Sequence, residues 1–434
     1  MKRASRYRIE AELGHLDLPM LDVCIGSQTI FRSGREVLPQ TCSREAYKTV
    51  CMRELLIFFP CDDTYRHCAQ KLNRVLWREG REQEIGARTM ANTVEREGSL
   101  IQAQLKQKAQ AILKPPAEPA GPLPEPPEPA SQHSFTAGML PAARVQEALT
   151  ELNEGQATSR QLRLEELSDR LEDPTLVKAN LSLDGVGCKQ QKARGRSKGA
   201  PKKARRETVE HQVAHLQDGA SHSYTFTAAS LCDLLQEIHA FLLHNDLLRQ
   251  PGPLVCFLDG APDLRLAIEK QLVGLPIIIL LDWYHLEKKC QERLSLALRG
   301  RAVKDPVLEE LLGWLWLGKV EQAIACLRAL PPSSIKNPLE LERLLTYFSR
   351  HQSEIPSYAL RQRLGLRISS NPVEKANDLV VARRQKHNGM SWSREGSTAL
   401  AALTCLLLNH QQRQWLLHQE VSFQFPPDAP PVAA

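Results

Sequence analysis

Two aspartates, Asp259 and Asp282, each follow directly on an apolar run that is rich in Val, Ile and Leu. These runs, residues 254–258 and 276–281, are typical of buried strands. Open α/β sheets present side chains for chemistry just beyond the carboxyl ends of their strands, and carboxylates gathered there suit a cation with oxygen ligands. The alternative is that each Asp caps the helix that follows it.

The second half of the chain supplies further acids in a definite order of elements. It predicts three strands, a helix, a strand, a helix, a strand, a helical block and a last helix, which is the order of the ribonuclease H-like α/β fold. In that fold an acid on the first strand, one after the fourth strand and one on a late helix converge. Asp184, Asp259 and Glu374 occupy these places, and Asp378, one turn beyond Glu374, is a reserve. Three such carboxylates could hold two Mg²⁺ ions ~4 Å apart for in-line phosphoryl transfer.

Four motifs occur in the order found in bacterial insertion-sequence DDE transposases: Leu-Asp184-Gly, Phe-Leu-Asp259-Gly-Ala, Asp282-Trp-Tyr-His285 and Asn371-Pro-Val-Glu374. The sequence resembles this family over about residues 179–415, and most nearly the groups labelled Kra-like and Lre-like. The resemblance implies a ribonuclease H-like core with an all-helical insertion. It also implies cleavage and strand transfer of DNA at transposon ends, with two Mg²⁺ or Mn²⁺ ions.

The resemblance also assigns roles to these acids. It implies that Asp184, Asp259 and Glu374 are catalytic and bind the metal. Asp282 and His285 look like the C/D-x-x-H signature of Mutator-like transposases, and we expect them, with Asp378, to lie behind the ligands. For His285 two interpretations stay open, namely contact with DNA or capping of its own helix.

The segments between these motifs predict a chain of several parts. We expect a mainly helical N-terminal DNA-binding region with an α+β start, a proline-rich linker, a helical connector, the first part of the core, the insertion, the C-terminal helices of the core and a loose tail. Their predicted bounds are 1–114, 115–130, 131–178, 179–285, 286–368, 369–420 and 421–434. The linker holds eight prolines in sixteen residues and favours polyproline II.

The N-terminal region contains a pattern that suits a helix-turn-helix. Residues 64–78 predict one helix, with Asp62 or Asp63 as its cap, and a second polar helix begins near residue 87. We expect this second helix to contact DNA through Arg88, Thr89, Asn92 and Arg96. Any αα-hairpin would give the same pattern, so that alternative stays open.

A basic run follows the first predicted core strand. Residues 189–206 contain nine Lys or Arg and no acid, which predicts a loop or arm that either contacts phosphate or is simply solvated. The resemblance gives this run no fixed role. The expected DNA contacts are Lys189, Lys192, Arg194, Arg196, Lys198, Lys202, Lys203, Arg205 and Arg206, together with Arg383, Arg384 and Lys386 on a later helix.

Composition adds weaker expectations. The 434 residues carry a formal charge of +6 and eleven cysteines, without a CxxC pair; the cysteines predict reduced thiols, with a metal clip near the N-terminus as an alternative. No signal peptide or membrane span is evident, so we expect a cytoplasmic, nucleoid-associated protein. Its partners would be double-stranded DNA and further copies of the chain, as a homodimer or larger synaptic complex.

Two rival functions remain from the sequence. One is another ribonuclease H-like nuclease, such as a junction resolvase, although such cores are usually compact. The other is a DNA-binding protein that derives from a transposase and has lost catalysis. Terminal inverted repeats in the DNA beside the gene would favour the transposase.

Overall fold

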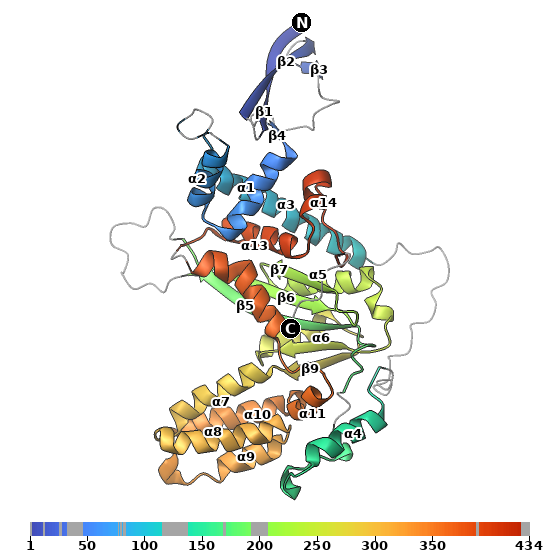
Figure 1. The fold of residues 1–434 in the computed structure, drawn as a ribbon, viewed down its shortest axis with the longest axis vertical. Helices are drawn as coiled ribbons and strands as arrows, with labels where there is room; N and C mark the ends of the chain where they lie inside the picture. Colours follow the sequence, from blue (N-terminus) through green and yellow to red (C-terminus); the bar gives the residue numbers. More distant parts are fainter. Residues whose placement is uncertain are drawn as a thin grey trace. The chain divides into compact units, whose positions relative to one another are not determined.

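The computed structural model divides the chain into two compact units, each assembled from segments that are far apart in the sequence (Figure 1). Unit 1 comprises Met1–Leu105, Gly187–Glu210 and Leu379–Ser422, and unit 2 comprises Lys106–Val186, His211–Asp378 and Phe423–Ala434. The residues that the structure describes are 2–11, 14–25, 28–32, 47–76, 78, 80, 84–114, 138–167, 171–191, 207–387 and 390–426. The predicted proline-rich linker, most of the basic run and most of the predicted tail lie outside these residues.

Unit 1 begins with a four-stranded sheet of order β3-β2-β1-β4. Its strands are β1 Lys2–Ala11, β2 Gly14–Ile25, β3 Gln28–Arg32 and β4 Tyr47–Lys48. The sequence predicts two strands that pair near residues 18–26 and 28–31, and this pairing is confirmed, because β2 and β3 are antiparallel. The N-terminal α+β start was therefore visible in the sequence, although β1 was not.

The helices of unit 1 come from both ends of the chain. They are α1 Val50–Asp62, α2 Tyr65–Val75, the first part of α3 Ala87–Leu113, α13 Arg394–Leu408 and α14 Gln412–His418. A buried carboxylate ties them together, because Glu97 of α3 accepts hydrogen bonds from Arg53 and from the indole of Trp415, each at 3.0 Å. Helices α1 and α3 therefore share one core with the C-terminal helices α13 and α14.

Two sequence-based boundaries in unit 1 were wrong. A single helix over residues 394–418 was predicted, but the chain breaks between α13 and α14, where His410 adopts a left-handed φ of 54°. The cap of α2 is Thr64, whose hydroxyl accepts from the backbone N–H of His67, and not the preceding aspartates. The α2–α3 connection over residues 76–86 is also longer than the three- or four-residue turn of a helix-turn-helix.

The central element of unit 2 is a five-stranded mixed sheet of order β7-β6-β5-β8-β9, so the chain is mixed α/β (Figure 1). Strands β6 and β7 form the predicted antiparallel hairpin, while β8 is parallel to β5 and β9 is parallel to β8. The strands are β5 Ala179–Lys189, β6 Thr208–Gln217, β7 Ser223–Ala228, β8 Leu254–Leu258 and β9 Ile277–Leu281.

One face of this sheet packs against α5 Leu231–His244, and α6 Pro262–Gln271 lies beside α5. The ring of Phe241 on α5 meets Tyr224 and Phe226 of β7, with centroids 4.5 and 5.3 Å apart. Because side chains alternate along a strand, Thr225 and Thr227 point to the opposite face. The face of β7 that packs on α5 is thus aromatic, and Val255 and Phe257 of β8 form a further buried apolar cluster with Ile278 and Leu280 of β9.

The insertion between β9 and the late helix is helical, as predicted. It contains α7 Trp283–Ala297, α8 Arg301–Trp316, α9 Val320–Arg328, α10 Pro338–His351 and α11 Tyr358–Arg363. Helices α7 to α10 lie side by side around one apolar core (Figure 1). The late helix, α12 Asn371–Asn377, follows and continues as a π-helical segment, Asp378–Lys386.

A single carboxylate joins the two ends of this insertion. Asp282 caps α7 by accepting from the backbone N–H of His285 at 2.8 Å, and it also accepts from the backbone N–H of Ser370, just before α12. The hydroxyl of Tyr358 donates to the carbonyl of Leu281 at 2.8 Å nearby. The chain therefore leaves β9 and returns to the same point before it enters α12.

A buried ion pair attaches the connector to the insertion. The connector contains α4 Ala142–Asn153 and ends near Glu172. The guanidinium of Arg361 donates to both carboxylate oxygens of Glu172 at 2.6 and 2.8 Å, and both side chains are buried. Such a paired geometry satisfies two charges that would be costly to bury separately.

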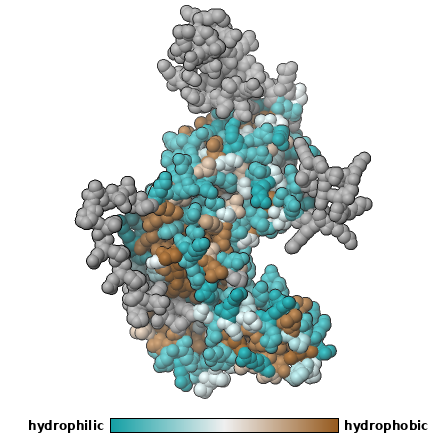
Figure 2. Space-filling view, turned by 180° about the vertical axis from the view of Figure 1, so that it is seen from behind, coloured by the Kyte–Doolittle hydropathy of each residue, from teal (hydrophilic) through white to brown (hydrophobic). Residues whose placement is uncertain are grey.

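No helix among the described residues is long and apolar enough to cross a membrane. On the face drawn in Figure 2, hydrophilic residues predominate over the described part of the chain, and apolar residues gather in a few patches. Exposed apolar side chains on helices include Leu243 of α5 and Leu266 of α6.

Glu237 on α5 should make stability depend on pH. Its side chain is 6% exposed, and burial raises its pKa from 4.5 to about 8, with Asp233 adding to the rise and Lys106 opposing it. The folded state thus keeps a proton that the unfolded state releases, so the associated stability is present below pH 4.5 and is lost as pH rises to about 8. We expect Glu237→Gln to remove this loss, which is worth about 1.4 kcal/mol for each pH unit.

Urea unfolding of both forms at several pH values between 5 and 8.5 measures this effect. The exposed Asp246→Asn is the matched control, since its side chain is 68% exposed and should show the pH dependence of the unsubstituted chain. A constant difference between Glu237→Gln and the unsubstituted chain at all pH values would contradict the expectation.

Candidate carboxylate site

The register of three parallel strands sets three aspartates side by side. Ser182 pairs with Phe257, and Leu258 pairs with Leu281. Continuing these registers by two residues and by one brings Asp184 level with Asp259, and Asp259 level with Asp282. Neighbouring strands lie about 4.8 Å apart, and level residues of parallel strands point to the same face. The three acids therefore project from one edge of the sheet.

Asp184 is the most enclosed of the proposed ligands. Its carboxylate accepts from the backbone N–H of Gly185 at 2.7 Å and from the side-chain amide of Asn377 at 2.6 Å. Burial raises the pKa of Asp184; the Gly185 hydrogen bond and His285 oppose the rise, and the charges of Asp259 and Glu374 add to it. Since charges act strongly only at short range, these three side chains are close electrostatic neighbours of Asp184.

Glu374 reaches the same place from α12. Its carboxylate lies 3.3 Å from Nε2 of His285, and its side chain is 51% exposed. Asn377, three residues further along the helix, lies on the same face and contacts Asp184 instead. The ring of His285 thus faces Glu374, and the cap of α7 is Asp282 and not His285; the contact of His285 with DNA stays a prediction.

Asp259 and Asp282 have different environments although their sequence settings are alike. Asp282 is 1% exposed, and both of its oxygens accept backbone hydrogen bonds. Asp259 is half-buried and accepts from the backbone N–H of Ala261 at 2.8 Å, while α6 begins without a side-chain cap. The capping interpretation therefore fits Asp282, and Asp259 keeps a carboxylate oxygen that has no hydrogen bond within the described part of the chain.

Two other side chains define the limits of the site. Asp378, the reserve ligand, lies on the exposed side at the start of the π-helical segment. Asn377, which the sequence reasoning did not select, is 7% exposed, and its Oδ1 has no hydrogen-bond partner among the described residues. The signal available was its spacing of three from Glu374 on a helix.

The donor set suits a hard divalent cation. Carboxylates of Asp184, Asp259 and Glu374 offer the oxygens that Mg²⁺ or Mn²⁺ prefers, and the unpartnered Oδ1 of Asn377 adds a neutral one. Within the described ranges, no three His, Cys, Asp or Glu side chains are already grouped closely enough to hold a metal ion. Binding would thus require Asp184 and Glu374 to exchange their contacts with Asn377 and His285 for the ion.

The predicted DNA-contacting residues fall into an exposed set and a buried one. Arg88, Thr89, Asn92 and Arg96 are all exposed on α3. Lys189 at the end of β5 is exposed too, as are Arg383 and Lys386 in the π-helical segment. Arg384 instead is 1% exposed, donates to the carbonyl of Pro60 at 2.8 Å and stacks over the rings of Tyr65 and Trp392. The other predicted contacts lie outside the described residues: Lys192, Arg194, Arg196, Lys198, Lys202, Lys203, Arg205 and Arg206.

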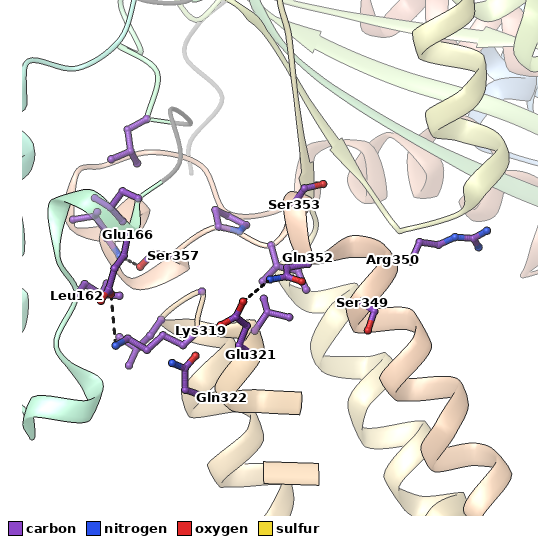
Figure 3. A pocket seen from close by; sticks show the side chains of 18 residues that line it. Leu162, Glu166, Lys319, Glu321, Gln322, Ser349, Arg350, Gln352, Ser353 and Ser357 are labelled. Atoms are coloured by element: carbon purple, nitrogen blue, oxygen red, sulfur yellow. Dashed lines mark hydrogen bonds and ion pairs between the residues drawn. The ribbon is translucent and has the colours of Figure 1, made fainter. Parts of the chain in front are cut away.

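Two hollows occur away from the acids. One, of about 860 Å³, lies in unit 1 and is lined by Arg88, Tyr65 and Trp392 among others. The other, of about 760 Å³, lies in unit 2 between the connector and the insertion (Figure 3). In it, Lys319 donates to the carbonyl of Gln161 at 2.7 Å. None of the predicted metal ligands lines either hollow.

Because the two aspartates have different environments, their removal should affect stability differently. We expect Asp282→Ala to lower the free energy of unfolding by about 2–4 kcal/mol, since it removes a cap and leaves the buried Ser370 N–H unpaired. Asp259→Ala should change it by less than about 1 kcal/mol. Urea denaturation of the two variants tests this contrast, and equal losses would refute it.

A comparison of the chain with protein-family models, with curated proteins and with solved structures gave no match. The interpretation of the acids therefore rests on their own geometry. Asp184, Asp259 and Glu374 come from β5, from the end of β8 and from α12, and the charges of the latter two add to the rise in the pKa of Asp184.

Proposed function

We propose that the chain is a DNA transposase that cleaves the ends of an insertion sequence and transfers them to a target with the help of Mg²⁺ or Mn²⁺. The observation that carries this proposal is the meeting of Asp184, Asp259 and Glu374, which are separated by up to 190 positions in the sequence. Clustered carboxylates repel one another, which is costly unless a cation neutralises them.

The topology supports a ribonuclease H-like core. If the strands are numbered one to five along the chain from β5 to β9, their order across the sheet is 3-2-1-4-5. The fourth and fifth run parallel to the first. Gly185 of β5 lies next to Gln212 of β6, and Gly187 of β5 lies next to Glu210 of β6. The numbers rise along β5 while they fall along β6, so the two strands run in opposite directions. A ribonuclease H-like fold has this strand order, with acids on the first strand, after the fourth and on a late helix.

In this proposal the residues of the chain have distinct tasks. Asp184, Asp259 and Glu374 would hold the two ions. Before the ions bind, Asn377 would hold Asp184 in place and His285 would hold Glu374, and the ions would then replace these contacts. When bound, the ions would supply the positive charge that activates the attacking oxygen and stabilises the leaving one. Asp282 would fix the start of α7 and the entry to α12 without binding metal.

DNA contact would come from unit 1 and from the basic run. The exposed Arg88, Asn92 and Arg96 on α3 offer a donor-rich surface for phosphates and base edges. Because two transposon ends must be held together, a dimer or larger synaptic complex is part of the proposal. The same DNA contacts would also serve a noncatalytic DNA-binding protein or another nuclease. An assay of cleavage and strand transfer therefore has to distinguish these functions.

The four acids provide the catalytic test. We expect Asp184→Asn, Asp259→Asn and Glu374→Gln each to bind end DNA normally and to lose cleavage and strand transfer, because an amide keeps the shape but removes the charge that holds the cation. Asp282→Asn should stay measurably active at saturating Mn²⁺. Cleavage of a labelled transposon end across a metal titration gives the readout.

Two results would change the assignment. Activity of Glu374→Gln together with an inactive Asp378→Asn would move the third ligand to Asp378. An Asp282→Asn variant as inactive as Asp259→Asn, and not rescued by metal, would place Asp282 among the ligands. Full activity of both Asp184→Asn and Asp259→Asn would refute the proposed metal-dependent mechanism.

A salt titration tests the α3 surface in the full-length chain, since α1 and α3 share a core with α13 and α14 and would not form it alone. Arg88→Gln should flatten the slope of log affinity against log salt by about 0.9, the value of one phosphate contact. Lys336→Gln removes an exposed charge from the insertion and should leave the slope unchanged. Identical slopes for both variants would exclude Arg88 from the DNA interface.

A further inference from the structure

Helix α10 of the insertion is fastened to the segment that follows Asp259. His351, at the end of α10, contacts Glu354 through Nδ1 at 2.6 Å, and both side chains are buried. Glu354 also accepts from the guanidinium of Arg265 on α6. Since α6 begins three residues beyond Asp259, this ion-paired trio holds the insertion against the turn that carries the carboxylate.

Tyr347 lies one helical turn before His351 and points to the same turn. The centroid of the Tyr347 ring is 4.5 Å from the centroid of the His351 ring. Nζ of Lys289 lies 5.6 Å from the centroid of the Tyr347 ring. The hydroxyl lies against Gly260, because a Cβ built on this glycine would be 2.5 Å from the phenolic oxygen. Gly260 also has a φ of +82°, so the turn suits glycine for both reasons.

The Tyr347 hydroxyl is a buried donor with no hydrogen-bond partner in the described part of the chain. Leaving such a group unpaired costs free energy, which makes a nearby acceptor significant. Asp259 is adjacent to Gly260, and one of its oxygens is already taken by the N–H of Ala261. A tyrosine hydroxyl with its ordinary pKa of about 10 is protonated at neutral pH, so this group can act as a donor.

We infer that Tyr347 is a positioning residue of the carboxylate site: its hydroxyl, which has no partner in the described part of the chain, donates to the Asp259 carboxylate when a cation binds and fixes the orientation of Asp259 around that cation. This inference rests on the proposed function for the role of Asp259. It gives the helical insertion a direct task at the site, because α10 delivers the hydroxyl. Tyr347 itself does not touch the reacting atoms.

Tyr347→Phe removes only the hydroxyl and tests the inference. Binding of Mn²⁺ to the full-length protein without DNA, followed by electron paramagnetic resonance, gives a readout that is independent of cleavage. We expect a three- to tenfold weaker Mn²⁺ affinity and a cleavage midpoint shifted to higher Mn²⁺ by a similar factor, with an unchanged thermal unfolding midpoint. Tyr284→Phe on α7 is the matched control, since this side chain is 49% exposed and should leave both values unaltered.

Asp259→Asn serves as the reference in the same titration. If it weakens Mn²⁺ binding while Tyr347→Phe does not, the positioning role is overturned and the proposed function stands. If neither variant weakens binding, both are overturned.

A pair of substitutions tests the contact itself. Gly260→Ala should weaken Mn²⁺ binding, because the new methyl group displaces the hydroxyl and strains the turn. In the Gly260→Ala background, Tyr347→Phe should then cost less than in the unsubstituted chain, since the displaced hydroxyl no longer reaches Asp259. Equal costs in both backgrounds would show that the hydroxyl acts on Mn²⁺ affinity without the contact described and would contradict the inference.

Discussion

The parallel register of β5, β8 and β9 is the constraint on which the candidate site depends. It sets Asp184, Asp259 and Asp282 in one row, because Asp184, within β5, is level with the residues that directly follow β8 and β9. A slip of one residue in β5 would turn Asp184 toward the face that packs on α5. The apolar packing of that face therefore fixes the position of a polar group on the other.

The three aspartates have different tasks: Asp282 supports the backbone, while Asp184 and Asp259 belong to the candidate site. Asp282 uses both oxygens to close the insertion on itself, so that α12 starts at a fixed point beside the sheet. From that start, the helical spacing brings Glu374 to His285 and Asn377 to Asp184. A buried acid that binds no ligand in our proposal thereby determines where two groups of the site lie.

Local patterns in the sequence predicted the strands and the helices of unit 2 well, because each apolar run or stripe is long and ends in a clear signal. Asp259 was selected by the same logic, since an Asp after a buried strand stands out, whereas Asp184 and Glu374 were selected by their places in the order of strands and helices. Asn377 and Tyr347 were not selected, because their meaning comes from contacts with residues 193 and 87 positions away. Arg384 shows the opposite case: a basic residue on a polar helix is expected at the surface, yet the rings of Tyr65 and Trp392 enclose it. The break at His410 was missed because no Gly or Pro marks it, although residues 409–414 are all polar.

The ion pair between Glu172 and Arg361 has a consequence for the growing chain. The two residues are 189 positions apart, and a ribosome that adds 5–20 residues each second needs roughly 10–40 s to make the second after the first. Glu172 stays hydrated and the connector stays undocked during this interval, while strands β5 to β9 are already available to pair. Docking of the connector is thus a late event in biosynthesis, and it completes only after almost the whole insertion has been made.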